Sequence, residues 1–139
     1  MESFRWDDLH EGQSATLVVT LASAHMDMFR QLSGDGNPLH ADPGFAAQLG
    51  FRDVVAFGML TSSYYSQLVG CYLPGRFCML HGIDIDFVSP AYVGDRLTVS
   101  GEIFHKSDAV RRLELRGRIV NQDGKTISRA KIRVGVHGS

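Results

Sequence analysis

The sequence has little cysteine, little proline and no surplus charge, and each shortage excludes a class of protein. Its only cysteines, Cys71 and Cys78, form no CxxC pair and cannot build a disulfide framework, so we expect free thiols in a reducing cytosol. Fourteen Lys and Arg against fifteen Asp and Glu leave a net charge of −1, which attracts neither nucleic acid nor an anionic membrane. Four prolines and 44% apolar residues exclude a disordered chain.

Segments that would enter a membrane are also lacking. The longest uncharged run, residues 54–75, is interrupted by glycine and carries serine, threonine, tyrosine and glutamine, so it is too polar for a transmembrane helix. The first eight residues include Glu2, Asp7 and Asp8 and lack the apolar core of an export signal. We therefore expect a cytoplasmic protein with no membrane or nucleic-acid partner.

What the chain does contain is one continuous pattern without repeats or linkers, so residues 1–139 are predicted to form a single domain. The first half predicts a strand over 14–21, a helix capped by Ser23 and closed by Gly34, and a short helix over 42–50. The second half is rich in strands: four segments alternate apolar and polar residues, over 83–87, 97–103, 113–119 and 130–136, the last two joined by a hairpin at Asp123-Gly124. This order is typical of an α+β fold.

The central element is predicted between Gly58 and Leu73, where apolar residues lie on nearly every side of a helix. At about 1.5 Å per residue this helix would be roughly 24 Å long, enough to cross a sheet. The sequence therefore predicts the hot-dog arrangement, in which a curved, mostly antiparallel sheet of about five strands wraps one long buried helix, with short helical turns overhanging one edge. Because such a sheet leaves open edges, we expect a homodimer.

Residues able to carry chemistry concentrate in the loop between the first two helices. Asp35 and His40 are five residues apart, and Pro38 restricts the backbone between them, so both side chains could hold one water molecule for acid–base chemistry. A second interpretation is that Asp35 and Asn37 only cap turns, as these residue types commonly do. The spacing taken alone favours capping.

Several other site types are excluded by spacing. Gly34-x-Gly36 lacks the third glycine of a dinucleotide-binding loop, and Leu39 and His40 stand where a calcium loop starting at Asp35 needs an oxygen ligand and a glycine. The six histidines show no zinc-ligand spacing, and no GxSxG nucleophile motif is present. The sequence predicts no metal.

Several short motifs taken together resemble the MaoC-like dehydratases, a family that includes (R)-specific enoyl-CoA hydratases. The motifs are Asp35-x-Asn37-Pro38-x-His40, Asp42-Pro43, Gly58-Met59-Leu60, Leu73-Pro74-Gly75 and Pro90-x-x-x-Gly94-Asp95, and the resemblance runs from about Phe29 to the carboxy terminus. It implies reversible hydration of a trans-2-enoyl thioester to the (R)-3-hydroxyacyl thioester. The acyl group would arrive on coenzyme A or an acyl carrier protein, and no cofactor would be needed beyond the coenzyme A of the substrate.

The resemblance also implies roles for individual residues. Asp35 and His40 would activate the water, and the backbone N–H of Gly58 would donate to the thioester oxygen as it gains charge, as a helix N-terminus can. Ser66 would hydrogen-bond and orient Asp35, and Asn37 would hold the loop.

One position departs from the family pattern. Phe57 stands where many members have a histidine before the helix-start glycine, which alters the floor of the substrate-binding site. Arg76 is a candidate for binding the coenzyme A phosphates, as are four strand arginines, Arg111, Arg112, Arg116 and Arg118. Two alternative functions remain open at this point: a hot-dog thioesterase and a non-catalytic acyl-binding protein.

Overall fold

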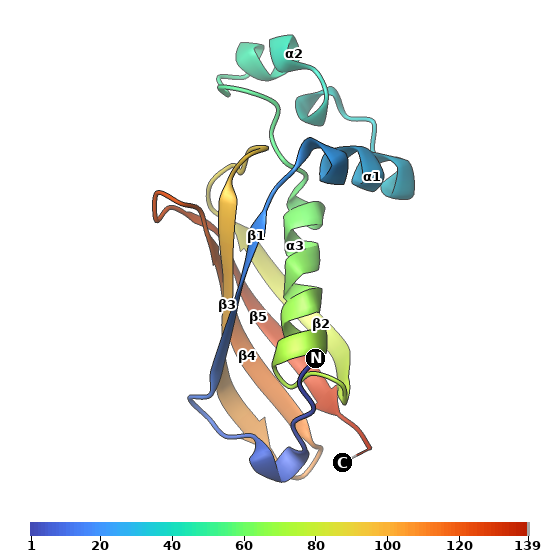
Figure 1. Cartoon of the computed structure of the whole chain (residues 1–139), viewed down its shortest axis with the longest axis vertical. Coiled ribbons are helices and arrows are strands. Elements are labelled where there is room, and N and C mark those ends of the chain that lie inside the picture. The colour runs from blue at the N-terminus through green and yellow to red at the C-terminus, as the bar shows by residue number, and fades with distance from the viewer. Residues whose placement is uncertain (139) are drawn as a thin grey trace.

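The computed structural model describes residues 1–138, in which a five-stranded antiparallel sheet curves around one helix (Figure 1). The strands occur in the order β1-β3-β4-β5-β2, and every neighbouring pair is antiparallel. Their bounds are β1 Ser14–Thr20, β2 Cys78–Phe87, β3 Arg96–Ser107, β4 Arg112–Val120 and β5 Thr126–Val136. The predicted hot-dog arrangement is confirmed.

The alternation of side chains gives the sheet one apolar face and one charged face. On β4, Leu113, Leu115 and Ile119 are fully buried, while the arginines between them are exposed. The hairpin between β4 and β5 lies at the predicted dipeptide, where Gly124 has a φ of 76°, the left-handed conformation that favours glycine. Strands β1 and β2 form the two edges of the sheet.

The central helix α3, Gly58–Gln67, runs along the apolar face and continues as a π-helical turn, η3, over Leu68–Tyr72 (Figure 1). Tyr65 anchors it to the sheet, because its hydroxyl and that of Ser128 on β5 are 2.8 Å apart in the buried core. The sequence predicts a buried helix with apolar residues on nearly every side, and this burial is incomplete, because Met59 is 64% exposed. The exposed side of the helix borders β2. Apolar residues of the two elements, among them Met59, Leu80, Ile83 and Ile85, line a second hollow at the surface.

Three helical turns overhang the N-terminal end of α3: α1 (Ser23–Ser33), η2 (Pro38–His40) and α2 (Pro43–Gln48) (Figure 1). The predicted cap of α2 is confirmed, because Asp42 Oδ1 accepts hydrogen bonds from two backbone N–H groups of the first turn at 2.9 and 3.2 Å. The predicted cap of α1 is wrong. Ser23 is already helical, and the capping residue is Ala22, whose N–H donates to His25 Nδ1 at 3.0 Å.

The opposite end of the sheet is closed by a short turn, η1 (Trp6–Asp8). No helix within residues 1–138 is both long and apolar enough to span a bilayer. Cys71 and Cys78 are both free, as the sequence predicts, and both are partly buried. Burial raises the pKa of the Cys78 thiol to about 11, which makes it a poor nucleophile near neutral pH.

Candidate active site

A cavity of about 600 Å³ lies between the overhanging turns and the start of α3. It takes its walls from α1 and the loop after it, from the segment leading into α3, and from the chain that follows β2. Its lining includes Phe29, Ser33, Asp35, His40, Phe51, Val55, Phe57, Gly58, Thr61, Phe87, Val88, Ala91 and Ile127. Asp35, His40, Phe57 and Gly58 of the sequence-predicted site are therefore brought together.

Asp35 is held by the turn that ends α1. Gly34 adopts a left-handed φ of 73°, which turns the chain out of the helix. The hydroxyl of Ser33 donates to the carbonyl of Phe29 at 2.7 Å and accepts from the N–H of Asp35 at 3.1 Å. Asp35 Oδ1 then accepts from the N–H of Asn37 at 3.0 Å. One carboxylate oxygen thus fixes the loop, and Oδ2 has no partner in the described part of the chain.

Asn37 shapes the turn that separates Asp35 from His40. Its side-chain oxygen accepts from the N–H of Leu39 at 2.9 Å, and its carbonyl accepts from the N–H of His40 at 3.1 Å. Pro38 supplies the first residue of η2. The two interpretations of this loop are therefore compatible. Asp35 Oδ1 and the side-chain oxygen of Asn37 cap turns. Asp35 and His40 still line the cavity, and Asp35 Oδ2 is not used in capping.

The imidazole of His40 is oriented by a backbone carbonyl. Nδ1 lies 2.6 Å from the carbonyl oxygen of Val55, and the N–H of Val55 donates to the carbonyl of Leu39 at 3.1 Å. Because a carbonyl can only accept, Nδ1 carries the proton, and Nε2 of the neutral ring is left with a lone pair. His40 can therefore accept a proton through Nε2. Val55 orients His40 through its backbone carbonyl, so its side-chain type gave no sign of this role.

Phe57 forms the floor under His40. The two ring centroids are 4.1 Å apart with planes inclined by 29°, and Phe57 is only 1% exposed. Phe29 packs on Phe57 in turn, with centroids 4.8 Å apart. The residue that departs from the family pattern thus shields one face of the imidazole from water.

The N-terminus of α3 presents backbone N–H groups at the cavity. The carbonyl of Phe57 accepts from Leu60 and Thr61 at 3.1 and 3.2 Å, so the N–H of Gly58 precedes the first helical hydrogen bond. Phe57, the residue before the helix, has no side-chain group that caps this end. The hydroxyls of Thr61 and Ser62 both donate to the carbonyl of Gly58, at 3.0 and 2.7 Å, and hold this first turn in place.

Glycine at position 58 leaves room for a side chain of the protein itself. A Cβ on Gly58 would lie 2.8 Å from Cε1 of Phe87, the last residue of β2. The Phe87 ring therefore lies directly against the start of α3 while remaining 54% exposed. Sequence reasoning missed Phe87, because nothing in its local pattern connects the end of a strand to the start of this helix.

Ser66 and Arg76 lie away from the cavity within one chain. Ser66 is exposed and lines the second hollow, about 12 Å along the helix from Gly58, and no hydrogen bond joins it to Asp35 in the described residues. The N–H of Arg76 donates to the carbonyl of Glu2 at 2.9 Å, beside the N-terminus at the opposite end of the helix (Figure 1).

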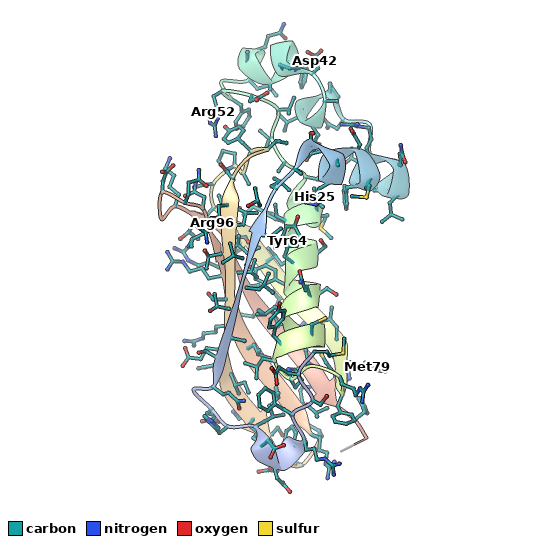
Figure 2. All side chains as sticks on the ribbon, viewed as in Figure 1. His25, Asp42, Arg52, Tyr64, Met79 and Arg96 are labelled. Atoms are coloured by element: carbon teal, nitrogen blue, oxygen red, sulfur yellow. The ribbon has the colours of Figure 1, made fainter. Side chains whose placement is uncertain are left out.

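The arginines near the cavity differ from those that the sequence analysis names as candidates for binding phosphate. Arg30 donates from Nη2 to the carbonyl of His40 at 3.5 Å. The guanidinium of Arg52, which follows the cavity residue Phe51, lies 3.9 Å above the ring of Tyr92 (Figure 2). Arg116, by contrast, covers Phe104 on the charged face of the sheet at 3.6 Å. Arg111 lies in the turn before β4 and not on the strand, and neither it nor the three arginines of β4 line the cavity.

Comparison with known proteins agrees with this architecture. Residues 8–123 match the family of MaoC-like domains. The chain belongs to the MaoC-like dehydratase family.

Relatives of this MaoC-like chain include the (R)-specific enoyl-CoA hydratase of Aeromonas caviae, which is 37% identical over 116 residues, or 84% of this chain and 87% of the relative. The solved (R)-hydratase of A. caviae, described as involved in PHA biosynthesis, superposes with a TM-score of 0.88 at 34% identity, over 93% of this chain and 98% of that one. The R-hydratase PhaJ1 of Pseudomonas aeruginosa gives a TM-score of 0.89 at 29% identity, over 96% and 86% of the two chains.

Proposed function

We propose that this MaoC-like protein catalyses the reversible addition of water to trans-2-enoyl thioesters, giving (R)-3-hydroxyacyl thioesters. The observation that carries the proposal is that Asp35 and His40 line the same cavity as the N-terminus of α3. The A. caviae relative bears the name of this activity and aligns over most of both chains.

In the proposed reaction, one water molecule lies between Asp35 and Nε2 of His40. As the water oxygen bonds to C3 of the enoyl group, these two side chains take up one of its protons and deliver a proton to C2, so the net change is H at C2 and OH at C3. The thioester oxygen gains negative charge during the addition, and the N–H of Gly58 donates to it. One donor of this kind typically contributes about 2.7 to 4 kcal/mol of transition-state stabilisation.

The substrate is proposed to be an acyl thioester of coenzyme A or of an acyl carrier protein. Phenylalanine, valine and isoleucine side chains line the cavity and suit the acyl chain. Arg30 and Arg52 are better placed for a carrier phosphate than Arg76, because Arg30 contacts the carbonyl of the cavity residue His40 and Arg52 lies on the overhang (Figure 2). The reaction moves only water and protons, so it requires no metal or redox cofactor. We also propose that the protein acts in the cytoplasm.

We further propose that the protein acts as a homodimer. The second hollow is apolar and lies between the exposed side of α3 and the edge strand β2, where Leu80, Ile83 and Ile85 meet Met59 and Ser66. An unpaired edge beside an apolar surface favours association. Light scattering at micromolar concentration should give twice the mass of the chain, and a monomer would contradict the proposal.

The activity is tested by offering trans-2-enoyl-CoA thioesters of increasing chain length. Hydration removes the conjugated double bond, so we expect loss of its ultraviolet absorbance without release of free thiol. Free thiol without hydration would identify a thioesterase instead. Recovery of unchanged thioester from a stable complex would identify a non-catalytic acyl-binding protein.

A further inference from the structure

A second group of side chains converges over Gly135, near the end of β5. A Cβ on Gly135 would lie 2.7 Å from Nε2 of His81 and 2.9 Å from Nε2 of His137. The absence of a side chain at position 135 is therefore what leaves room for both imidazoles. The ring centroids are 6.1 Å apart with planes at 67°, so the rings meet edge to face and do not stack.

The fold brings these histidines together from distant parts of the sequence. His81 lies where the pairing of β2 with β5 shifts between Leu80 and Gly82, and such an irregularity re-aims a side chain. His137 directly follows β5, and its N–H donates to the carbonyl of Phe77 at 2.8 Å. Both histidines are exposed.

A methionine lies on the strand next to Gly135. Met79 pairs directly with Gly135 across the strands, so its side chain rises on the same face of the sheet, and it is 56% exposed. Figure 2 shows Met79 toward the end of the sheet that lies away from the overhang. Among residues 1–138, no third histidine, cysteine or carboxylate joins the group.

These donors select one class of ligand. Neutral imidazole and thioether groups suit copper and zinc, whereas magnesium and calcium require oxygen ligands. The residue opposite Gly135 on β4 is Arg112, which supplies no carboxylate that would attract a hard cation. Copper(II) stands above zinc in affinity for nitrogen ligands, and reduced copper accepts thioether sulfur.

We propose that His81 and His137 bind a copper ion through their Nε2 atoms, with Met79 as a third ligand to the reduced ion. Both nitrogens lie within 3 Å of the position that a Cβ would take on Gly135, so they are near enough to each other for ring rotations to bring both to one ion above the sheet. The bound ion links the edge strand β2 to the chain end that follows β5. The site is independent of the proposed hydration, since none of its residues lines the cavity.

The test uses the full chain without a polyhistidine tag, freed of metal by a chelator. Calorimetric titration with Cu²⁺ should show one strong equivalent, with nitrogen hyperfine coupling in its electron paramagnetic resonance spectrum and a rise in Tm on binding. His81→Gln and His137→Gln should each weaken binding at least tenfold and abolish the rise in Tm. His105→Gln is the matched control, because His105 is exposed on β3 outside the group.

The proposal is overturned if the Gln variants, shown by circular dichroism to be folded, bind Cu²⁺ as tightly as the wild-type chain. Equal weakening by His105→Gln would also overturn it, because binding would then be spread over surface histidines. Met79→Leu should weaken binding of Cu⁺ while leaving Cu²⁺ unaffected. Unchanged Cu⁺ affinity would contradict the role given to Met79.

Discussion

The imidazole of His40 lies on the ring of Phe57, with centroids 4.1 Å apart, while its Nδ1 is fixed by the carbonyl of Val55 at 2.6 Å. One contact sets the plane of the ring and the other its rotation. Together they orient the ring, and within residues 1–138 no carboxylate forms an ion pair or hydrogen bond with the imidazole. This relationship gives Phe57 a positioning role, because it acts through His40.

Replacing Phe57 tests that role. Phe57→Leu keeps the floor apolar but removes the flat surface under the imidazole, and displacement of a reacting group by about 1 Å can cost up to 100-fold in rate. We expect kcat for enoyl-CoA hydration to fall roughly 10- to 100-fold with little change in KM. Phe104→Leu, on the far face of the sheet, is the control. A rise in KM with kcat unchanged would show that Phe57 binds substrate without positioning His40.

Asp35 and His40 can be altered without disturbing the loop. Asp35→Asn retains an oxygen that can accept from the N–H of Asn37, and His40→Asn retains a donor toward the carbonyl of Val55. Each variant should lower kcat by about 10²- to 10⁴-fold, the usual contribution of an acid–base group. Far-ultraviolet circular dichroism should be unchanged. Near-normal turnover by both variants would remove these residues from the mechanism.

The contact between Gly58 and Phe87 predicts a rescue. Gly58→Ala keeps the backbone N–H but sets a methyl group 2.8 Å from Cε1 of Phe87, so the ring or the helix start must move. We expect Gly58→Ala to lower kcat/KM, and Gly58→Ala combined with Phe87→Ala to recover part of the loss. If the double variant is no better than the single one, the methyl group obstructs the substrate instead.

The buried pair of Tyr65 and Ser128 predicts sensitivity to alkali. Burial raises the pKa of Tyr65 from 10.0 to about 12, so the unfolded chain loses this proton first as the pH rises. The stabilisation is intact below pH 10 and declines up to pH 12, by about 1.4 kcal/mol per pH unit. Urea unfolding of Tyr65→Phe should show a shallower alkaline decline than the wild-type chain or Tyr72→Phe, a control at a partly exposed tyrosine. Equal slopes would contradict this assignment.

At neutral pH the same substitution should be destabilising. Tyr65→Phe leaves the hydroxyl of the fully buried Ser128 without its partner, which typically costs about 1 to 3 kcal/mol. The cost is read from the urea midpoint at unchanged slope. Tyr72→Phe again serves as the control, and an equal midpoint for the two variants would show that the hydroxyl pair contributes nothing.

The strands were predictable because their side chains alternate so regularly. Leu113, Leu115 and Ile119 point one way and the arginines between them the other, and this pattern follows from burial of one face alone. The Asp42 cap was predictable because its hydrogen bonds are local. The cap of α1 was not, because the side chain of His25 there provides the acceptor for the N–H of Ala22.

The polar residues of the candidate active site were predictable from the sequence, whereas the groups that orient and enclose them were not. Asp35, Asn37 and His40 lie within six residues of one another, so the motif that contains them is visible in the sequence. The orientation of His40 depends on the carbonyl of Val55, which any residue type would supply. Phe87 reaches Gly58 only through the fold, and the same is true of His81 and His137 above Gly135.

The most direct test of the proposed function is the configuration of the product. The wild-type chain and Asp35→Asn should be incubated in parallel with a trans-2-enoyl-CoA, and the 3-hydroxyacyl product separated by chiral chromatography after hydrolysis. We predict the (R)-3-hydroxy acid from the wild-type chain and about 10²- to 10⁴-fold slower formation of it by the variant. Formation of the (S) enantiomer, or equal rates for the two proteins, would contradict the mechanism built on Asp35, His40 and Gly58.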